Sequence, residues 1–571
     1  MLLIALMLAQ VVPAQAQTTL VEHRGVWLHP KQFADRATCD EYVARMARAG
    51  INICYPLVWY HGGRACWHTQ TCAQDEIVTD DYDPLAYLVK KCHAAGIQVH
   101  AWFVNGALGA PEPVGPFAGH TDWLVEVSPG VHASWWDLGK PEVRAMEKQL
   151  MVEVVEKYPV DGVHFDYIRY DGSMLCFCDH CRGEFKQRYG LDIMTLSADK
   201  FPLAAAISAN PLGKPTTARV LVSVDGGPPA IAVNTVGDGN VLLFNWQVYY
   251  RPPKAASKVL DDFLSSVGGG KNKPLLLYRP EETIAKYGTR TLGLVRSWLG
   301  QLGYKSAIIK TDRLDSLKPT DVLFLVAAYY TPEEVAAKLL KFVQAGGALV
   351  VVDGPVYGIK NPSLQKVLGF AGTAGYYNGF KSLVVETPSG LIPTGGKLLT
   401  PEEAERIGKA WAEYRKDGVS QLVKSVFEAV KALRPDAAVT AAVFATLRSA
   451  DSVFQDWPRW IREGFIDYVL PMAYVMTDAD LEERFKDWES VNPDLSQIIP
   501  GLSLYQRVHG KAEPRPPDLV LHQIELCRKH PYHGVNFFAL AYLNDDLVKA
   551  LSEGPFKQPA RPYVPLLRPG G

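Results

Sequence analysis

An acidic residue near the end of a predicted strand is the first candidate for chemistry. The alternating apolar residues of 160–168 predict a β-strand, and the turn-forming pair Asp161-Gly162 marks its start. Side chains alternate across a strand, so His164 and Asp166 share one face. In a parallel barrel that face points to the axis, and the carboxyl end of the strand opens onto the place where barrel enzymes act. Asp166 is therefore a candidate acid, base or nucleophile.

A structural role for Asp166 is the alternative. This carboxylate could cap the segment that follows, or it could form an ion pair with Arg169. Structural ion pairs also gather acidic residues, so the residue type alone does not decide between the two roles.

Aromatic residues are abundant, with 13 Trp and 26 Tyr in the chain. On loops above a barrel they would offer flat apolar faces, which suit sugar rings as well as other ligands. Trp135 and Trp136 could equally fill the rim of the barrel. The candidate substrate-binding residues are Trp27, Trp59, His61, Asn105, Trp135, Arg169, Tyr170, Tyr474 and Tyr505.

Cysteines form a second cluster of reactive side chains after the Asp166 strand. Three cysteines and a histidine lie within six residues, namely Cys176, Cys178, His180 and Cys181. Zinc prefers such ligands, but neighbouring positions in a chain do not easily all reach one tetrahedral ion. Because an exported chain favours disulfides, we expect disulfide bonds, such as Cys66 with Cys72 and one that involves the cluster. A structural zinc is the alternative, and no other cofactor is expected.

Strands and helices alternate over residues 20–195. Near-continuous apolar strands joined by helices indicate a parallel sheet covered by helices. The strands that precede the Asp166 strand are predicted at 23–28, 51–59 and 97–104, and the helices at 38–49, 83–95 and 141–158.

The same pattern returns in residues 400–553. A long helix or helix pair from 400 to 434 leads into four strands, predicted at 439–444, 468–472, 498–504 and 535–540. Four strands in each half make eight, which is the count that a closed (β/α)8 TIM barrel requires. Residues 554–571 are a Pro-rich tail that we expect to run over the surface.

The sequence between the two halves predicts an insertion after the fourth barrel strand. Residues 196–270 are β-rich, with strands expected at 220–224 and 240–246. Residues 271–395 alternate strand and helix as a doubly wound α/β domain does. The predicted fold class is therefore α/β, a TIM barrel interrupted by a β-rich segment and a doubly wound domain.

Composition and the first residues bear on partners and location. With 59 basic and 61 acidic residues the net charge is −2, so nothing predicts binding to nucleic acid or an anionic membrane.

Residues 1–16 are an apolar run that ends in Ala14-Gln15-Ala16, which is typical of a cleaved signal peptide. The run is shorter than the roughly 20 residues that span a bilayer. We expect a secreted or periplasmic protein with no membrane attachment after cleavage.

Several separated motifs resemble one family. They are His-Arg-Gly-Val-Trp at 23–27, Trp-Trp-Asp-Leu-Gly-Lys-Pro-Glu-Val-Arg at 135–144, Asp-Gly-Val-His-Phe-Asp-Tyr-Ile-Arg-Tyr at 161–170, and Gln455-Asp456-Trp457 through Pro471-Met472-Ala473-Tyr474. Together these motifs look like the glycosyl hydrolase-like 10 family. The resemblance implies a glycoside hydrolase barrel that acts on a polysaccharide or cell-surface glycan. A catalytically inactive carbohydrate-binding or assembly protein on the same scaffold is the alternative.

The inserted segment resembles the glutamine-amidotransferase-like domain of some β-galactosidases. A working amidotransferase needs a nucleophilic cysteine after the strand at 322–326, where this chain has Ala327-Ala328-Tyr329. The resemblance therefore implies a structural domain, through which the chain could form oligomers.

The mechanism implied by the resemblance calls for a second group beside Asp166. Glycoside hydrolysis ordinarily uses two carboxyl groups that flank the bond. We assign Asp137 to the catalytic set with Asp166 and His164, although every candidate could instead be a surface or capping residue; the others are Asp171, Asp451 and Asp545.

Chitinase-type enzymes offer a different mechanism, in which the acetamido group of the substrate is the nucleophile. The Asp166 strand resembles their acidic run, with His164 and Ile168 in place of two acidic residues, and Met472-Ala473-Tyr474 resembles their Met-x-Tyr. On this likeness Asp166 is the acid, His164 tunes it and Tyr474 holds the sugar.

Overall fold

The structure is a computed structural model that describes residues 20–566, except for 129–130, 173–175, 177, 191–207, 210–211, 225–226, 246–253, 354–360, 373–376, 379–382, 386–400, 492–494 and 509–510. The predicted signal peptide, residues 1–16, lies outside the described residues. None of the helices in the described part of the chain combines the length and the apolar character that a bilayer crossing requires.

Eight parallel strands form a barrel, as the sequence predicts. Hydrogen-bonded neighbours follow the order β21-β20-β9-β6-β3-β2-β25-β22, and parallel bridges from Val469 to Ile498 and from Met472 to Gly501 link the two ends of this row. The strands are β2 (His23–Leu28), β3 (Ile53–Tyr60), β6 (Gln98–Val104), β9 (Gly162–Asp166), β20 (Ala438–Val443), β21 (Tyr468–Pro471), β22 (Gly501–Ser503) and β25 (Gly534–Phe538).

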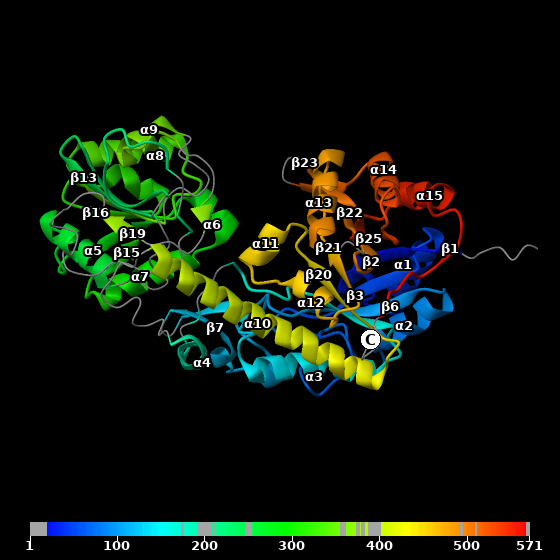
Figure 1. The fold of residues 1–571 in the computed structure, drawn as a ribbon. Coiled ribbons are helices and arrows are strands. Elements are labelled where there is room, and N and C mark those ends of the chain that lie inside the picture. The colour runs from blue at the N-terminus through cyan, green and yellow to red at the C-terminus, as the bar shows by residue number, and fades with distance from the viewer. Residues whose placement is uncertain are drawn as a thin grey trace, which may run out of the picture.

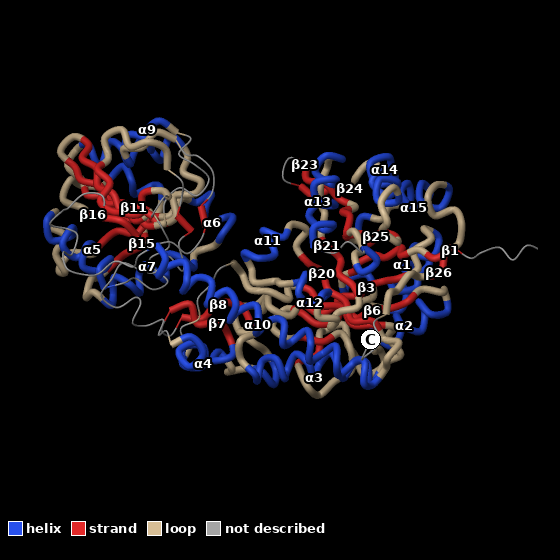
Figure 2. The backbone as a smooth tube through the Cα atoms, viewed as in Figure 1, coloured by secondary structure: helices blue, strands red, loops and turns tan. Residues whose placement is uncertain are grey.

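Helices surround the strands, and Figure 2 shows them in blue around the red barrel. Asp35 and Asp83 begin the first two by accepting hydrogen bonds from the backbone N–H groups of Thr38 and Ala86, which the helices themselves leave unsatisfied. The helices of the barrel are α1 (Arg36–Arg48), α2 (Pro84–Ala94), α3 (Pro141–Lys157), α4 (Asp179–Tyr189), α10 (Pro401–Leu433), α11 (Leu447–Ser452), α12 (Trp457–Arg462), α13 (Asp478–Val491), α14 (Pro517–Arg528) and α15 (Asp545–Glu553).

Hairpins and short strands lie on the loops of the barrel. They are β4 (Arg64–Ala65), β5 (Ala73–Gln74), β7 (Leu124–Ser128), β8 (Val131–Trp136), β23 (Tyr505–Val508) and β24 (Lys511–Pro514).

The interior of the barrel is polar and aromatic. The Trp27 indole N–H donates to Nε2 of His164 at 3.0 Å, and Nδ1 of His164 lies 2.8 Å from the Thr440 hydroxyl. The hydroxyls of Tyr55 and Tyr468, from opposite parts of the ring, lie 2.9 Å apart. Because buried polar groups are costly unless they are hydrogen-bonded, this network also selects one arrangement of the strands.

The strand that carries Asp166 is shorter than predicted. Its outward residues, Val163 and Phe165, lie in the large apolar core that also contains α3 residues. The predicted strand 160–168 ends at Asp166, because Tyr167 adopts a left-handed backbone conformation with a φ of 49°. The alternation of faces stops there, and Ile168 packs into the outer core.

The insertion forms one sheet from both of its predicted parts. Its strand order is β15-β14-β16-β17-β13-β12-β11-β19, in which β14 to β17 run parallel and β11 to β13 are antiparallel. The strands of 196–270 therefore extend the sheet of 271–395. The sequence analysis did not identify β12, and Gly288 separates the helices α6 (Glu281–Tyr287) and α7 (Arg290–Gln301).

Figure 1 shows the inserted elements, in green, as a lobe apart from the blue and orange barrel. They are β10 (Ser208–Ala209), β11 (Arg219–Val224), β12 (Pro229–Val236), β13 (Gly239–Phe244), α5 (Lys254–Ser266), β14 (Leu275–Tyr278), α6 (Glu281–Tyr287), α7 (Arg290–Gln301), β15 (Ser306–Ile308), β16 (Val322–Val326), α8 (Glu333–Gln344), β17 (Ala348–Val352), α9 (Pro362–Leu368), β18 (Tyr377–Asn378) and β19 (Leu383–Val385).

The Pro-rich tail packs more closely than a surface segment would. Its β26 (Ala560–Arg561) pairs in parallel with β1 (Leu20–Val21). Tyr563 accepts a hydrogen bond from His23 through its backbone oxygen, and its ring packs against the cluster inside the barrel. The tail thus covers the end of the barrel at which β2 begins.

We expect Gly162→Ala to destabilise the barrel. A Cβ at this position would lie 2.6 Å from the backbone oxygen of Ala438 and 2.7 Å from Nδ1 of His100, and the backbone of β20 cannot move aside freely. Overpacking of this kind costs about 1–3 kcal/mol. Gly183→Ala in α4 is the matched control, because no atom would lie within 4 Å of its Cβ. A thermal unfolding midpoint of Gly162→Ala equal to that of the control would contradict the tight packing of β9 on β20.

Candidate active site at the mouth of the barrel

Asp166 lies at the carboxyl end of β9 and on the inner face of the barrel. Asp166 is only 8% exposed to solvent. Oδ1 accepts a hydrogen bond from the backbone N–H of Tyr167 at 2.6 Å, and Oδ2 accepts one from the indole N–H of Trp102 at 3.2 Å. Trp102 reaches it diagonally, because β6 pairs with β9 in a register that sets Trp102 beside His164 and Val104 beside Asp166.

Burial changes the acidity of this carboxyl group. Desolvation raises the pKa of Asp166 to about 6, against the lowering effects of the Tyr167 N–H, the Arg169 charge and the Trp102 indole. A carboxyl with this pKa is still partly protonated close to neutral pH, and a general acid must be protonated to act. The sequence left open an ion pair with Arg169; in the structure the Arg169 charge lowers the pKa of Asp166, but desolvation outweighs this effect.

Aromatic rings from several strands surround this carboxyl. The ring of Phe538, at the end of β25, lies 5.4 Å from that of Tyr474 and 6.2 Å from that of Tyr505. His29, just after β2, lies between Trp102 and Phe538 with ring separations of 5.4 and 5.7 Å. Burial is the main cause that raises the pKa of the Tyr474 hydroxyl well above its usual value, and the charge of Asp166 adds to it. Tyr474 therefore keeps its proton.

A cation lies on the other side of Asp166. The guanidinium of Arg169 lies over the rings of Tyr167, Phe444 and Trp135 at 4.6, 4.7 and 5.4 Å. The indole N–H of Trp135 donates to the backbone oxygen of Arg169 at 2.8 Å. Stacking on three rings holds the charge in place, and Tyr167 is 39% exposed above it.

His164 and Trp27 belong to the interior of the barrel below the mouth. Both are buried and hydrogen-bonded to each other. Burial holds the pKa of His164 well below its usual value. Neutral His164 accepts at Nε2, so its proton is on Nδ1 toward Thr440, and the groups that set the pKa of Asp166 do not include it. This arrangement does not support the expectation that His164 tunes Asp166.

Trp59 and Asn105 lie outside the ring of strands. The register of β3 on β6 shifts between Leu57 and Trp59, and this irregularity turns Trp59 toward the outer core, where it stacks with Trp136. The Asn105 side chain is fully buried and donates to Glu147 of α3 at 2.6 Å. Neither residue faces the mouth, so the expectation that they bind substrate is corrected. His61 is exposed on the loop after β3.

Asp137 and Tyr170 are buried together away from solvent. Oδ1 of Asp137 accepts hydrogen bonds from Arg415 at 2.7 Å and from the Tyr170 hydroxyl at 3.1 Å, and all three side chains are 0% exposed. Its other oxygen faces three cysteines. Because Asp137 is enclosed by these partners, its assignment as a catalytic carboxyl is corrected, and Tyr170 is not placed to bind substrate.

The remaining acidic candidates are on the surface. Asp171 is exposed, Asp451 pairs with Lys416 at 2.7 Å, and Asp545 lies 3.6 Å from Arg45. None of the interactions described for them involves the Asp166 carboxyl.

The cysteines are free thiols, contrary to the expectation of disulfides. All nine, Cys66 and Cys72 included, are buried, and none of them forms a disulfide. Cys176, Cys178 and Cys181 gather around Asp137, whereas His180 turns to the backbone oxygen of Gly139 at 3.3 Å.

Trp102, His29 and Phe538 are site residues that the sequence analysis missed. Trp102 could have been found, because in the strand predicted at 97–104 it alternates onto one face with His100, as Asp166 does with His164. Phe538 and His29 stand at strand ends, where no local pattern indicates which way a side chain points.

The surface also has a cavity of about 880 Å³ at the opposite end of the barrel. Its lining includes Glu22, which precedes β2, and His533, which precedes β25. It therefore lies at the end where barrel strands begin, away from Asp166.

The barrel segments match the sequence model of the family described as Glycosyl hydrolase-like 10, over residues 22–179 and 396–513. Glycosyl hydrolase DigH of Escherichia coli K12 is 30% identical over 206 residues, which cover 28% of this chain and 46% of DigH. Glycosyl hydrolase YngK of Bacillus subtilis is 30% identical over 92 residues, covering 15% of this chain and 18% of YngK. The chain thus spans about half of the length of DigH and less than a fifth of the length of YngK.

Solved structures show more distant likenesses. The PgaB (BpsB) glycoside hydrolase domain of Bordetella bronchiseptica has 9% identity and a TM-score of 0.45, covering 94% of this chain and 97% of that one. The β-galactosidase of Bacillus circulans has 12% identity and a TM-score of 0.42, covering 92% and 51%. These likenesses are too distant to inform function.

Asp166→Asn should change how stability depends on pH. The unfolded carboxyl titrates near 3.8 and the folded one at about 6, so between these values the folded state holds more protons and its stability falls as pH rises. Compared with the Asn variant, the wild type should lose up to about 3 kcal/mol of unfolding free energy from about pH 4 to pH 7. Denaturant unfolding of both proteins at each pH gives the difference in their unfolding free energies. The contributions of the other titrating groups are the same in both proteins and cancel in this difference.

Asp171→Asn, on an exposed side chain of the same loop, is the control for this measurement. A stability difference between wild type and Asp166→Asn that stays constant over this pH range would show that the carboxyl is not desolvated.

Proposed function

We propose that this chain, whose barrel belongs to the Glycosyl hydrolase-like 10 family, is a glycoside hydrolase in which Asp166 is the general acid. The observation that carries the proposal is the carboxyl at the exit of β9, buried among aromatic rings with its pKa raised to about 6. In the (β/α)8 barrel the carboxyl ends of the strands are where chemistry takes place. When the glycosidic bond breaks, the oxygen of the leaving group needs a proton, and a carboxylic acid of raised pKa can supply it.

Two fixed contacts orient the acid. The Tyr167 N–H and the Trp102 indole each hold one carboxyl oxygen, so the group cannot rotate freely. Both donors stabilise the carboxylate that remains after the proton has gone to the leaving group. Arg169 is close enough to lower the pKa of Asp166 and adds to this stabilisation.

The nucleophile in this proposal comes from the substrate. Among the described residues, three of the four acidic candidates for a second carboxyl are engaged elsewhere, Asp137 with Arg415, Asp451 with Lys416 and Asp545 with Arg45, and the fourth, Asp171, is exposed on the surface. An acetamido group next to the scissile bond replaces the second carboxyl in substrate-assisted glycosidases. The substrate would then be a glycan of N-acetylated amino sugars, and the Tyr474 hydroxyl, which keeps its proton near Asp166, would hold the acetamido group.

Aromatic rings would bind the sugars on either side of the bond. At the mouth, Tyr474 stacks on Phe538 and Tyr505 packs edge-on against the same ring, and all three side chains are partly exposed. The nonpolar face of a pyranose ring packs on such surfaces, while its hydroxyls find polar partners at the rim.

The inserted domain has no chemical role in this proposal. After β16, at the position of an amidotransferase nucleophile, Ala327 has a φ of 56° and carries only a methyl group. We propose that this domain is structural or mediates assembly.

Hydrolysis of N-acetylated amino-sugar oligosaccharides tests the function. We expect turnover of acetylated oligosaccharides and none of their de-N-acetylated counterparts, which lack the internal nucleophile. Asp166→Asn should lower kcat about 10²–10⁴-fold, the usual contribution of a general acid. The wild-type rate should decline as the pH rises above about 6, because the acid then loses its proton. Product release followed by mass spectrometry gives these rates.

Asp171→Asn is again the matched control and should keep the wild-type rate. Wild-type turnover by Asp166→Asn, or equal turnover of de-N-acetylated oligosaccharides, would contradict the proposed mechanism. Binding of acetylated oligosaccharides without any turnover would favour the inactive scaffold instead.

Tyr474→Phe tests the role of the hydroxyl. The ring and its stack on Phe538 remain, so substrate binding should change little, while the loss of one hydrogen-bond donor at the reacting group should lower kcat by about 10²-fold. Steady-state kinetics separate the two effects. An increase in KM at unchanged kcat would mean that Tyr474 only binds the sugar.

A further inference from the structure

Four side chains with metal-ligand chemistry converge in one buried place outside the proposed active site. They are Asp137, from the loop between β8 and α3, and Cys176, Cys178 and Cys181, from the segment between β9 and the first turn of α4. One ligand atom of each lies within 4.8 Å of those of the other three. Asp137, Cys176 and Cys181 are 0% exposed and Cys178 is 7% exposed.

The separations match those of ligands on one small ion. Oδ2 of Asp137 lies 3.1 Å from the Cys181 sulfur, 3.2 Å from Cys176 and 3.8 Å from Cys178. A tetrahedral zinc has Zn–S distances of about 2.3 Å and Zn–O distances of about 2.0–2.2 Å, which separate a sulfur and an oxygen ligand by roughly 3.5 Å. The four atoms therefore need only small shifts to surround an ion.

We propose that Asp137, Cys176, Cys178 and Cys181 bind a structural Zn²⁺ ion. Three thiolates and a carboxylate fill the tetrahedral shell, which is the closed arrangement of structural zinc sites, in contrast to catalytic sites that keep one position for water. On binding, each thiol releases its proton to solvent and its sulfur becomes the ligand. This proposal does not depend on the proposed glycosidase activity.

Second contacts around the cluster suit such an ion. Oδ1 of Asp137 is held by Arg415 at 2.7 Å, by Tyr170 and by the backbone N–H of Gly139 at 3.1 Å, which leaves Oδ2 for the ion. The Cys176 sulfur accepts from the Glu126 N–H, and the Cys178 sulfur from the Cys181 N–H, both at 3.4 Å.

Buried positive charges balance the site. Three thiolates and one carboxylate exceed the charge of Zn²⁺ by two negative charges. Arg415 is fully buried against Asp137, and Lys140, 7% exposed, interacts electrostatically with all four proposed ligands. Two cations thus offset the excess, and the buried site carries little net charge.

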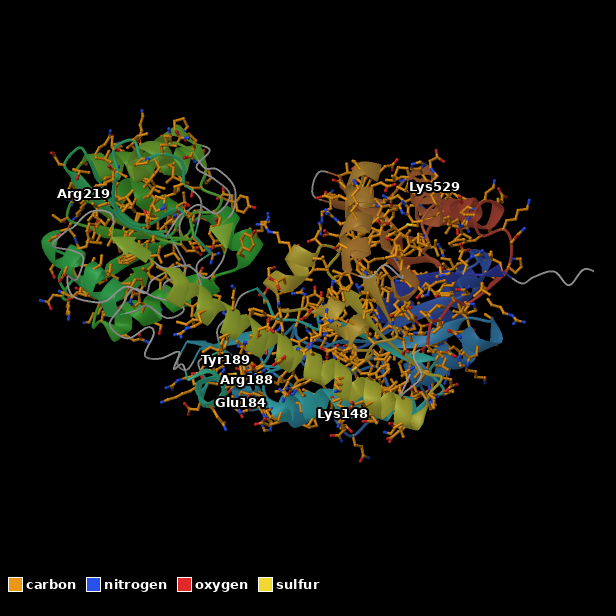
Figure 3. The ribbon with its side chains drawn as sticks, viewed as in Figure 1. Lys148, Glu184, Arg188, Tyr189, Arg219 and Lys529 are labelled. Carbon is orange, nitrogen blue, oxygen red and sulfur yellow. The ribbon has the colours of Figure 1, made fainter. Side chains whose placement is uncertain are left out.

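The ion would join three parts of the barrel. Tyr170 connects Asp137 to the segment that follows Asp166, and Arg415 connects it to α10, the helix that leads back from the insertion. Helix α4 lies along α10 as well. Figure 3 labels Glu184, Arg188 and Tyr189 on α4. Glu184 accepts a hydrogen bond from the hydroxyl of Tyr414 in α10 at 3.3 Å, and Arg188 forms an ion pair with Asp417 of the same helix.

Zinc content of the full chain tests the proposal. We expect one zinc per chain by inductively coupled plasma mass spectrometry after purification under reducing conditions without a metal-affinity step. Cys178→Ser and Asp137→Asn should lose most of it, and their melting temperatures should fall. Cys527→Ser removes a buried cysteine of α14 outside the cluster and should keep the zinc. His180→Ala should also keep it, because His180 contacts the Gly139 oxygen instead.

A spectroscopic measurement covers the case in which ligand variants fail to fold. The wild type loaded with Co²⁺ alone should show thiolate-to-cobalt charge-transfer absorption and the visible bands of a tetrahedral ion. A chain with neither zinc nor these bands would overturn the proposal, as would an intact mass that reveals a disulfide among the three cysteines. Loss of zinc from His180→Ala, or retention by Cys178→Ser, would overturn the ligand set.

Discussion

Desolvation of one carboxyl group is the constraint on which the proposed function of this barrel depends. Asp166 stands where β9 ends, so its backbone belongs to the rigid ring while its side chain reaches the mouth. Few water molecules can reach it, and the indole of Trp102 and the N–H of Tyr167 take the place of water as donors. These two hydrogen bonds and the charge of Arg169 do not fully replace hydration, and the remaining cost appears as a raised pKa of Asp166. The same cost lowers the stability of the folded protein above that pKa, as is common at sites shaped for activity.

The polar interior below the mouth supports this arrangement. Histidines at the axis, His23, His100 and His164, are held neutral by burial, which lowers the pKa of the first two to about 4 and about 3. A neutral ring can accept a hydrogen bond from one neighbour and donate one to another, as His164 does between Trp27 and Thr440. A barrel filled in this way binds its strands through directional hydrogen bonds, which hold β9 at one height relative to β6 and β20.

The insertion and the barrel meet in an elaborate junction around α10. The helix runs along α3 and α4 on the outside of the barrel (Figure 1), and the side chain of its Arg415 reaches the buried cluster of Asp137, Tyr170 and three cysteines. The strong donors to the buried Asp137 carboxylate, Arg415, Tyr170 and the Gly139 N–H, all bind Oδ1, whereas Oδ2 has only thiols, which are weak donors. The proposed zinc would turn this costly group of side chains into a stabilising one. It would also tie the segment after Asp166 to the helix that follows the insertion.

Local patterns in the sequence determined the strands, the helices and the inward direction of Asp166, because side chains alternate within a strand regardless of what surrounds it. The count of eight and the interruption after the fourth strand followed from the same patterns. The partners were decided only by the tertiary structure. Trp102 comes from β6, Phe538 from β25 and Tyr474 from the loop after β21, and Arg415 comes from beyond the insertion. Residues were misplaced where the alternation within a strand fails and where a loop joins distant segments. The irregularity in β3 turned Trp59 outward, and the long reach between 137 and 176 hid the fact that Asp137 belongs with the cysteines. Contacts between distant segments exist only once the ring has closed, and no local period encodes them.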